Sequence, residues 1–288
     1  MSRPTPGVAT TVPLTVQDDC GDWQTFVGAG PSVDIRLPIA TRAFADRSDD
    51  NSGYQVHVMY VLPSDGTDDH LDIDGTLTIS VRAFQKWLAS QTGSQRLRLD
   101  TYQGILDITF YRLGRTDAEI RSRNQFVRDQ IQQDLQAAGF NHPRKLYAVY
   151  YGGSSNFSCG GGAWPPALIG NVAALYLRGE PPGAIPCNTN RFAQSENAPG
   201  YLEFSMLHEI FHTVGVVPTC APHHTLAGHV SEDPRDLMYA GPQPWNPSIL
   251  DVGHDDYYGH GRPSCLDLAK SAFLDPSALG AAPPPGWP

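Results

Sequence analysis

The stretch that most constrains the fold of this chain runs from residue 201 to residue 215 and contains two histidines four residues apart. Its apolar residues recur at steps of three and four, which is the spacing of a buried helical face. They are Phe204, Leu207, Phe211 and Val214. Pro199 before this stretch and Gly215 at its end are the usual boundary residues of a helix. The sequence therefore predicts a helix over residues 200–215.

The two histidines of this helix, His208 and His212, lie one helical turn apart, so their side chains project together and can bind one metal ion. Zinc accepts neutral imidazole nitrogens at about 2.0–2.1 Å. Glu209 follows the first histidine, which places its carboxylate beside the metal and not on it. There it can take a proton from a zinc-bound water, whose pKa zinc lowers to about 7. The alternative is two surface histidines and an ordinary glutamate, and the combination of the three residues favours zinc.

The run His208-Glu-x-x-His212, followed by a glycine three residues later, resembles the motif of the metzincin metallopeptidases. The segment Asp236-Leu237-Met238-Tyr239 resembles their Met-turn. The resemblance is specific over residues 201–239, weaker over the preceding elements and absent over both ends of the chain. It implies an α/β (α+β) fold of the zincin type, with a mixed sheet, packed helices and an irregular C-terminal subdomain.

The same resemblance implies a zinc-dependent endopeptidase in which Glu209 is the catalytic base. Met238 would pack beneath the metal ligands as an apolar floor and would not bind zinc. Four side chains are candidates for polarising the substrate oxygen, although each is also expected to have a structural role: Tyr239, His254, Tyr257 and Tyr258. Two other functions stay open, a zinc-stabilised binding domain without turnover and a zinc hydrolase acting on something other than peptides.

The third zinc ligand is where the chain departs from the metzincin pattern, because position 218 holds a proline and not a histidine. Glu232 has about the spacing of the thermolysin-like peptidases, but Pro234 disfavours a second helix around it. In the shorter metzincins the third histidine precedes the Met by about eight residues, and His229 precedes Met238 by nine. We therefore predict His229 as the third ligand, with residues 216–228 as an insertion. The rivals that stay open are His223, His224, Glu232 and Asp233.

Alternating or continuously apolar segments predict strands over residues 54–62, 97–100, 105–113, 145–151 and 171–177, and helices over 77–89 and 116–138. This order predicts a mixed sheet with helices packed against it. His57, in the first strand, is expected to be a packed residue. From the resemblance, segment 171–177 is expected to be the edge strand that borders the cleft and pairs with an extended substrate.

The domain organisation predicted from these elements is a single catalytic domain over residues 21–278, whose upper part ends at about 215. Residues 1–20 are expected to be a flexible lead-in and residues 279–288 a Pro-rich tail. An acidic loop over residues 64–75 could bind Ca²⁺ through Asp68, Asp69, Asp72 and Asp74, but its spacing does not match an EF-hand. A solvated turn that caps the next helix is the favoured interpretation of this loop.

Composition excludes several classes of partner. The net charge of −10 and the absence of a basic stripe argue against nucleic acid. No apolar run approaches the roughly 18 residues of a membrane span. We expect a monomer that acts on a protein or peptide substrate.

The five cysteines bear on the compartment. Cys159 and Cys187 bracket a Gly/Pro-rich segment, and Cys220 and Cys265 bracket the segment after the central helix, which predicts two disulfides. Cys20 is left over, and five reduced thiols are the alternative. The first residues lack the apolar core of a signal peptide. We nevertheless expect a secreted, extracellular protein whose export signal is not part of the printed sequence.

Overall fold

The structure is a computed structural model that describes residues 14–17, 23–26, 41–182 and 186–288. The chain divides into two compact units, Met1–Ile39 and Ala40–Pro288. In the first unit, β1 (Leu14–Gln17) pairs antiparallel with β2 (Trp23–Phe26). The predicted lead-in over residues 1–20 falls mostly outside the described residues, as does Cys20.

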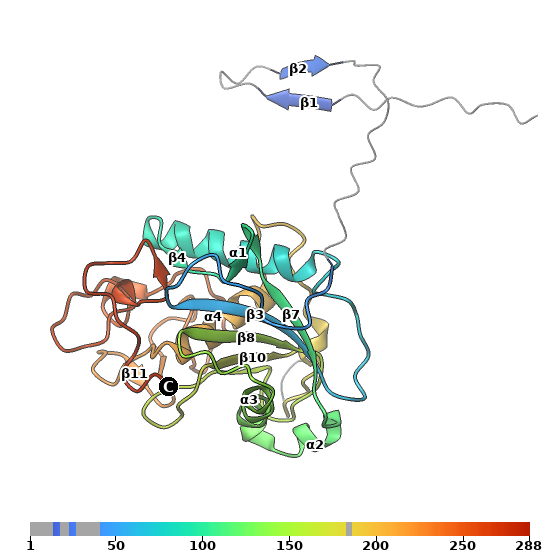
Figure 1. Ribbon diagram of the computed structural model, residues 1–288. Coiled ribbons are helices and arrows are strands. Elements are labelled where there is room, and N and C mark those ends of the chain that lie inside the picture. The colour runs from blue at the N-terminus through green and yellow to red at the C-terminus, as the bar shows by residue number, and fades with distance from the viewer. Residues whose placement is uncertain (1–13, 18–22, 27–40, 183–185) are drawn as a thin grey trace, which may run out of the picture. The chain divides into compact units, whose positions relative to one another are not determined.

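The second unit is built on a five-stranded sheet with the order β7-β3-β8-β10-β9 (Figure 1). Four of its strands run parallel: β7 (Ile108–Arg112), β3 (Gln55–Leu62), β8 (Lys145–Tyr151) and β10 (Val172–Tyr176). The two-residue strand β9 (Gly160–Gly161) pairs antiparallel with β10 and forms one edge of the sheet. The prediction of a mixed α/β sheet is confirmed, whereas the prediction that segment 171–177 is the edge strand is wrong.

Helices cover both faces of this sheet (Figure 1). α1 (Thr76–Thr92) and α4 (Tyr201–Thr213) pack on one face, and α2 (Asp117–Arg121) and α3 (Val127–Ala137) pack on the other. Successive strand side chains point to opposite faces, so alternate residues of β3 enter separate cores. Tyr60 belongs to the core under α1 and α4, and Val61 to the core under α3. Because both faces are covered, the central strands are continuous apolar runs.

The predicted long helix over residues 116–138 is interrupted in the structure. A 3₁₀ turn, η1 (Asn124–Phe126), lies between α2 and α3. Asn124 has a φ of 54°, a left-handed conformation that no α-helix continues through. Apolar periodicity spans the break because both helices bury residues against the same sheet face, so the sequence pattern alone does not reveal it.

The remaining elements of the second unit are short. Two small antiparallel ladders join β5 (Thr101–Tyr102) to β6 (Ile105–Leu106) and β4 (Arg96–Leu97) to β13 (Leu274–Asp275). A third joins β11 (His224–Thr225) to β12 (His229–Val230). Three 3₁₀ turns complete the set: η2 (Cys187–Thr189), η3 (Val252–His254) and η4 (Leu268–Lys270).

The last residues of the chain contact the body of the second unit. Ala282 donates its backbone N–H to the carbonyl of Lys270 at 3.2 Å. The Trp287 ring lies edge-on to Phe273, with 4.8 Å between ring centroids. The segment predicted as a Pro-rich tail, 279–288, therefore includes residues that pack onto the loops before it.

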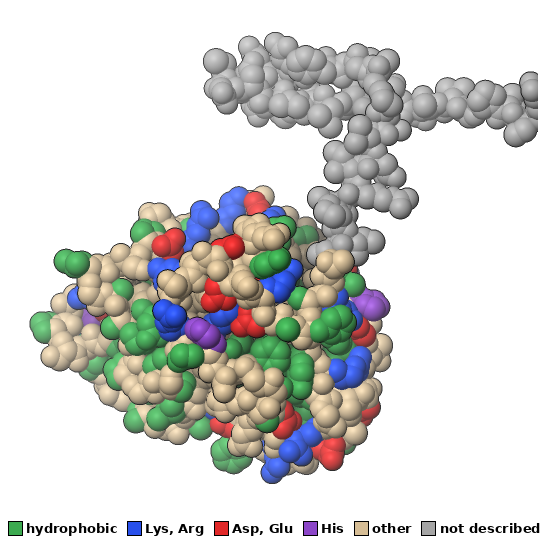
Figure 2. All heavy atoms as spheres, viewed as in Figure 1, with side chains coloured by type: hydrophobic (Ala, Val, Ile, Leu, Met, Phe, Trp, Pro, Cys, Tyr) green, Lys and Arg blue, Asp and Glu red, His purple; other side chains and the backbone are tan. Residues whose placement is uncertain are grey.

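The two predicted disulfides, Cys159–Cys187 and Cys220–Cys265, are both present in the structure. No helix among the described residues is long and apolar enough to cross a membrane. On the face shown in Figure 2, cationic and anionic side chains are interspersed with apolar ones. Charge on that face is therefore mixed and does not form a surface of one sign.

The Cys220–Cys265 bridge is expected to stabilise the unit because it closes a separation of 45 residues in a region with little regular structure. Replacing both cysteines by serine should lower the free energy of unfolding by about 2–5 kcal/mol. Denaturant unfolding followed by circular dichroism measures this loss. Equal stability of the double variant and the wild type would contradict the expectation.

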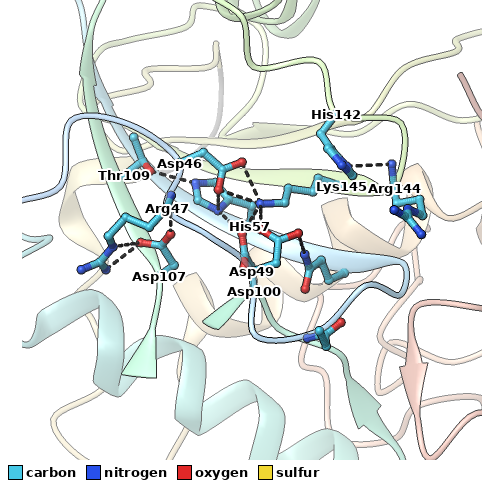
Figure 3. Close-up of polar contacts among 12 residues, drawn as sticks. Asp46, Arg47, Asp49, His57, Asp100, Asp107, Thr109, His142, Arg144 and Lys145 are labelled. Carbon is cyan, nitrogen blue, oxygen red and sulfur yellow. Dashed lines mark hydrogen bonds and ion pairs between the residues drawn. The ribbon is translucent and has the colours of Figure 1, made fainter. Parts of the chain in front are cut away.

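A buried polar cluster lies where β3 and β8 begin (Figure 3). The imidazole of His57, which is fully buried, contacts Asp100 Oδ2 at 2.6 Å and Thr109 Oγ1 at 2.9 Å. The ammonium group of Lys145 donates to Asp46 and Asp49 at 2.6 Å and to Asp100 at 2.7 Å. Ligand atoms of Asp46, His57, Asp100 and Asp107 lie closely enough together to hold a metal ion, but Lys145 already supplies the positive charge. His57 is thus a packed residue, as predicted.

The acidic loop before α1 is held by arginines. Arg42 forms ion pairs with Asp68 and Asp72, and Arg178 contacts Asp69 at 3.0 Å. Asp74 Oδ1 accepts the backbone N–H of Thr76 at 2.8 Å, at the start of α1. The carboxylates proposed as calcium ligands therefore bind guanidinium groups and a helix terminus, which supports the turn interpretation.

Candidate metal centre and active site

The central helix α4 is fixed at its N-terminal end by a buried glutamate. Glu203 has no exposed surface, and its carboxylate accepts hydrogen bonds from Gly200 N at 2.9 Å, Ala193 N at 3.1 Å and Ser80 Oγ at 2.7 Å. These three donors satisfy the buried carboxyl group and tie the helix to α1 and to the preceding loop. Glu203 thus anchors the start of the helix that carries His208.

The other end of α4 stops directly after the second histidine. Gly215 donates its N–H to His212 O at 2.9 Å, and Val216 donates to Phe211 O at 3.0 Å. This pair of bonds is the Schellman arrangement, which requires a left-handed residue after the helix. Gly215 has a φ of 90°. A side chain there would be strained, so the glycine is required by the helix end.

The chain then returns to the helix through a small hairpin. β11 and β12 pair His224 with Val230 and Thr225 with His229. The connecting residues Ala227 and Gly228 have φ angles of 63° and 72°, which turn the chain back sharply. The segment predicted as an insertion therefore folds back onto α4 and carries His229 with it.

Three imidazole rings meet at this point. The Nε2 atoms of His208 and His212 are 2.9 Å apart. The Nε2 atom of His229 lies 3.1 Å from that of His212 and 3.3 Å from that of His208. Ligands at about 2.0–2.1 Å from a tetrahedral zinc ion are about 3.3–3.4 Å apart. These three nitrogens form a group that could hold a metal ion.

The opposite nitrogen of each ring faces a backbone carbonyl. His208 Nδ1 lies 2.7 Å from Leu237 O, His212 Nδ1 lies 3.2 Å from Val216 O, and His229 Nδ1 lies 3.1 Å from Leu226 O. A carbonyl only accepts, so each Nδ1 carries the proton of a neutral ring. All three Nε2 atoms then present lone pairs to one another, and none can donate a hydrogen bond to the others. This arrangement fits a metal ion bound between them.

Burial keeps these rings neutral. It lowers the pKa of His208 to about 3, with a smaller contribution from the charge of His229, and it also lowers the pKa of His212 and His229. Neutral imidazole is the form that binds a metal.

Glu209 lies beside the histidines and is not a member of their group. Burial raises the pKa of the Glu209 carboxyl to about 8, against the opposing effects of the Arg128 charge and a hydrogen bond from the backbone of Gly162. A bound cation nearby would favour the ionised carboxylate. Glu209, His208 and His229 all line one cavity of about 250 Å³.

The walls of this cavity come from segments far apart in the sequence. Besides the two histidines and the glutamate, its lining residues are Ser158, Cys159, Gly160, Tyr201, Ser205, Tyr239 and Trp245. The Trp245 ring stands edge-on to both His208 and Tyr201, with 5.6 Å between centroids in each pair. The lining thus combines aromatic rings and hydroxyl groups with the carboxylate of Glu209.

The predicted Met-turn is organised by Asp236, a residue for which no separate role was predicted. Its Oδ1 accepts Met238 N at 2.7 Å and Tyr257 OH at 2.8 Å, and its Oδ2 accepts Val252 N at 2.8 Å. These bonds hold the turn whose Leu237 carbonyl faces His208. Met238 is fully buried in the core shared with α4, and its role as a floor for the ligands stays a prediction.

The rival metal ligands are engaged elsewhere. His223 Nδ1 lies 3.0 Å from Asp256 and 3.1 Å from Glu232. Asp233 pairs with Arg235 at 2.6 Å. His224 belongs to the same hairpin as His229 but is not part of the three-histidine group. Of the five residues considered, the structure brings His229 to His208 and His212.

Of the four candidates for polarising the substrate oxygen, one lines the cavity and the others lie outside it. Tyr239 lines the cavity, and its hydroxyl accepts Gln243 N at 3.1 Å. Tyr257 is buried and donates to Asp236, while Tyr258 donates to Gln95 Oε1 at 2.8 Å. His254 is exposed and is not a cavity residue. Tyr257 and Tyr258 thus have structural roles.

Comparison with known proteins identifies no family. No protein-family model matches the sequence, and no curated protein matches it significantly.

Several solved structures are similar in part. Two crystal structures of wild-type OgpA from Akkermansia muciniphila align with TM-scores of 0.35 and 0.39 at 17% identity, covering 62% and 75% of this chain. A catalytically inactive OgpA in complex with an O-glycopeptide (glycodrosocin) substrate aligns with a TM-score of 0.38 at 14% identity, covering 79% of this chain. The chain spans 51%, 62% and 68% of the three OgpA chains. Because this similarity is low, we base the function on the geometry of the site itself.

Proposed function

We propose that this protein is a zinc-dependent endopeptidase. The observation that carries the proposal is the convergence of three histidine Nε2 atoms at a cavity that also contains the Glu209 carboxylate. A structural zinc site has four protein ligands, whereas a catalytic site has three and leaves one position open. Among the described residues, this group contains three histidines and no fourth donor. His208 and His229 line the cavity, so a metal held by the three histidines would be accessible from it.

The metal and the side chains would have different roles in the reaction. Zinc, when bound, acts as a Lewis acid and lowers the pKa of water to about 7. Glu209 accepts the proton of the attacking water and passes it to the amine that leaves. Its enclosed position beside the ligands, and not among them, suits a carboxylate that moves protons. Tyr239, the last residue of the predicted Met-turn, also lines the cavity and carries a hydroxyl group.

An extended peptide has a place to bind along β9. One side of this strand pairs with β10, and the sheet order has no further strand beyond it among the described residues. Free backbone groups of an edge strand bind a peptide without regard to its sequence. Gly160 belongs both to this strand and to the cavity lining, so a peptide paired with β9 would pass over Glu209. The substrate class we propose is therefore protein or peptide.

The other functions considered fit this site less well. A zinc-stabilised binding domain needs neither a cavity at the metal group nor a partly buried carboxylate beside it. A hydrolase for non-peptide substrates would use the same catalytic groups, but it would not need the edge strand. The two disulfides are typical of an oxidising compartment, so we propose that the peptidase acts outside the cell.

Digestion of casein with and without a chelator tests the proposal. Zinc-loaded protein is expected to contain about one zinc ion per chain and to release peptide fragments. Removing the zinc should abolish release, and adding zinc back should restore it. Zinc-loaded protein that releases no fragments from casein or from a peptide library would contradict the endopeptidase. Retained folding and zinc in that case would favour the binding domain.

A further inference from the structure

Three consecutive glycines, Gly160–Gly162, lie against the central helix although their backbone does not require glycine. None of the three has a φ in the left-handed range. Glycine in a strand costs about 0.5–1 kcal/mol relative to alanine because the unfolded chain is more flexible. Three glycines in a row, of which Gly160 and Gly161 form β9, therefore indicate a close approach that leaves no room for side chains.

The first glycine faces the proposed catalytic base. A Cβ atom added to Gly160 would lie 2.5 Å from Glu209 Oε1 and 2.9 Å from its Cδ and Cγ atoms. These distances are far below van der Waals contact, so any side chain at this position would displace the carboxylate. The bare Cα of Gly160 is therefore part of the surface that encloses Glu209.

The other two glycines determine how closely this segment packs against α4 and against Tyr176. A Cβ atom on Gly162 would lie 2.5 Å from Glu209 O and 2.7 Å from His212 Cβ. A Cβ atom on Gly161 would point to the opposite side and lie 2.6 Å from Tyr176 OH. The alternation follows the strand period of two, so Gly160 and Gly162 together press on the helix backbone and on the Glu209 side chain.

This close approach is held by bonds on both sides of the glycines. Cys159 O accepts Tyr176 N at 2.8 Å, and the Cys159–Cys187 bridge ties the same residue to η2. Ser158 Oγ donates to Gly160 O at 2.5 Å. On the far side, Ala163 N donates to Thr213 Oγ1 at 3.2 Å. The strand is thus anchored to β10 and to α4 at the same time.

We propose that Gly160 is a positioning residue for the reaction. Its bare backbone is the wall against which the Glu209 carboxylate rests, and the Cys159–Cys187 bridge keeps that wall in place. The inference rests on the proposed function, because it takes Glu209 as the base. It goes beyond that function because it proposes that the edge strand β9, and not the metal site, orients the Glu209 carboxylate.

The test is Gly160→Ala. The added methyl group should displace the Glu209 carboxylate in a crystal structure of the variant. A displacement on the order of 1 Å should lower kcat by about 100-fold, with a smaller change in KM. Zinc content should equal that of the wild type because no histidine moves. Gly114→Ala is the matched control: its added methyl meets no atom within 4 Å and its φ is ordinary, so kcat should stay unchanged.

A second substitution distinguishes a steric effect on the Glu209 side chain from a nonspecific loss of activity. Glu209→Asp shortens the side chain by one methylene, which makes room for the methyl group at position 160. The kcat loss in Gly160→Ala/Glu209→Asp should be smaller than the product of the two single losses. Multiplicative losses would overturn the inference, as would an unmoved Glu209 carboxylate in the Gly160→Ala crystal structure. If the zinc-loaded wild type cleaves no peptide, the proposed function fails, and the crystal structure still decides whether Gly160 positions Glu209.

Discussion

Replacing Glu209 by alanine is expected to lower kcat by about 100- to 10,000-fold while the zinc content stays at the wild-type level. The reason is the division of roles in the site. Three histidine nitrogens form the group that could hold the metal, and the Glu209 carboxylate lies next to them without belonging to it. Deleting the carboxylate therefore removes the proton acceptor and leaves the donors and their carbonyl partners in place. Zinc analysis of the purified variant and peptide cleavage rates measure the two effects separately.

Glu209→Gln is the matched variant for this experiment. It keeps the size of the side chain and removes its basicity, so it should lose activity as the alanine variant does. Glu196→Ala, at an exposed glutamate with 49% of its side-chain surface accessible, controls for loss of a carboxylate as such and should keep full activity. A zinc-loaded Glu209→Ala protein with near-normal turnover would exclude the proposed mechanism.

Replacing His229 by alanine is expected to remove both zinc and activity. Loss of a partner that merely orients a ligand lowers metal affinity by about 10–100-fold, and loss of the ligand itself should exceed that range. His229 supplies one of the three Nε2 atoms, at 3.1 and 3.3 Å from the other two. Competition with a chromogenic chelator measures the affinity, and peptide cleavage measures the activity.

His224→Ala is the control for this variant because it lies in the same hairpin, paired with Val230, and not in the histidine group. It should retain zinc. His223→Ala should also retain zinc, because His223 contacts Asp256 and Glu232. Collapse of zinc affinity in either of these variants, together with a small change in His229→Ala, would show that the third ligand has been assigned to the wrong residue.

The local sequence determined the central helix and the main strands. Apolar residues at helical spacing predicted a helix over 200–215, and α4 spans Tyr201–Thr213. Continuous or alternating apolar segments likewise predicted β3, β8 and β10. These predictions succeed because periodicity reports which faces of an element are buried, and burial on both faces gives a strong signal. The pairing of four cysteines could also be predicted from their positions around loop-rich segments.

Tertiary structure alone decided what surrounds those elements. The edge strand is β9, whose two glycines carry no apolar pattern by which a sequence could reveal a strand. The 3₁₀ turn that interrupts the helix over 116–138 depends on one left-handed residue, Asn124. Arg42, which pairs with the acidic loop, is 26 and 30 residues away from its two partners. Each of these features depends on a contact or a backbone angle that the amino-acid pattern does not encode locally.

In the candidate metal site, too, the sequence predicted one part and the tertiary structure decided the other. Spacing on one helix placed His208 and His212 together, because a helical turn is a local geometry. Counting from the Met-turn singled out His229 but could not exclude its rivals, since a loop can return to the helix in many ways. The structure brings His229 to the other two rings through the β11–β12 hairpin and directs all three Nε2 atoms inward through backbone carbonyls. Carbonyls belong to every residue, so sequence cannot show which of them orients a ring, and only the folded chain decides it.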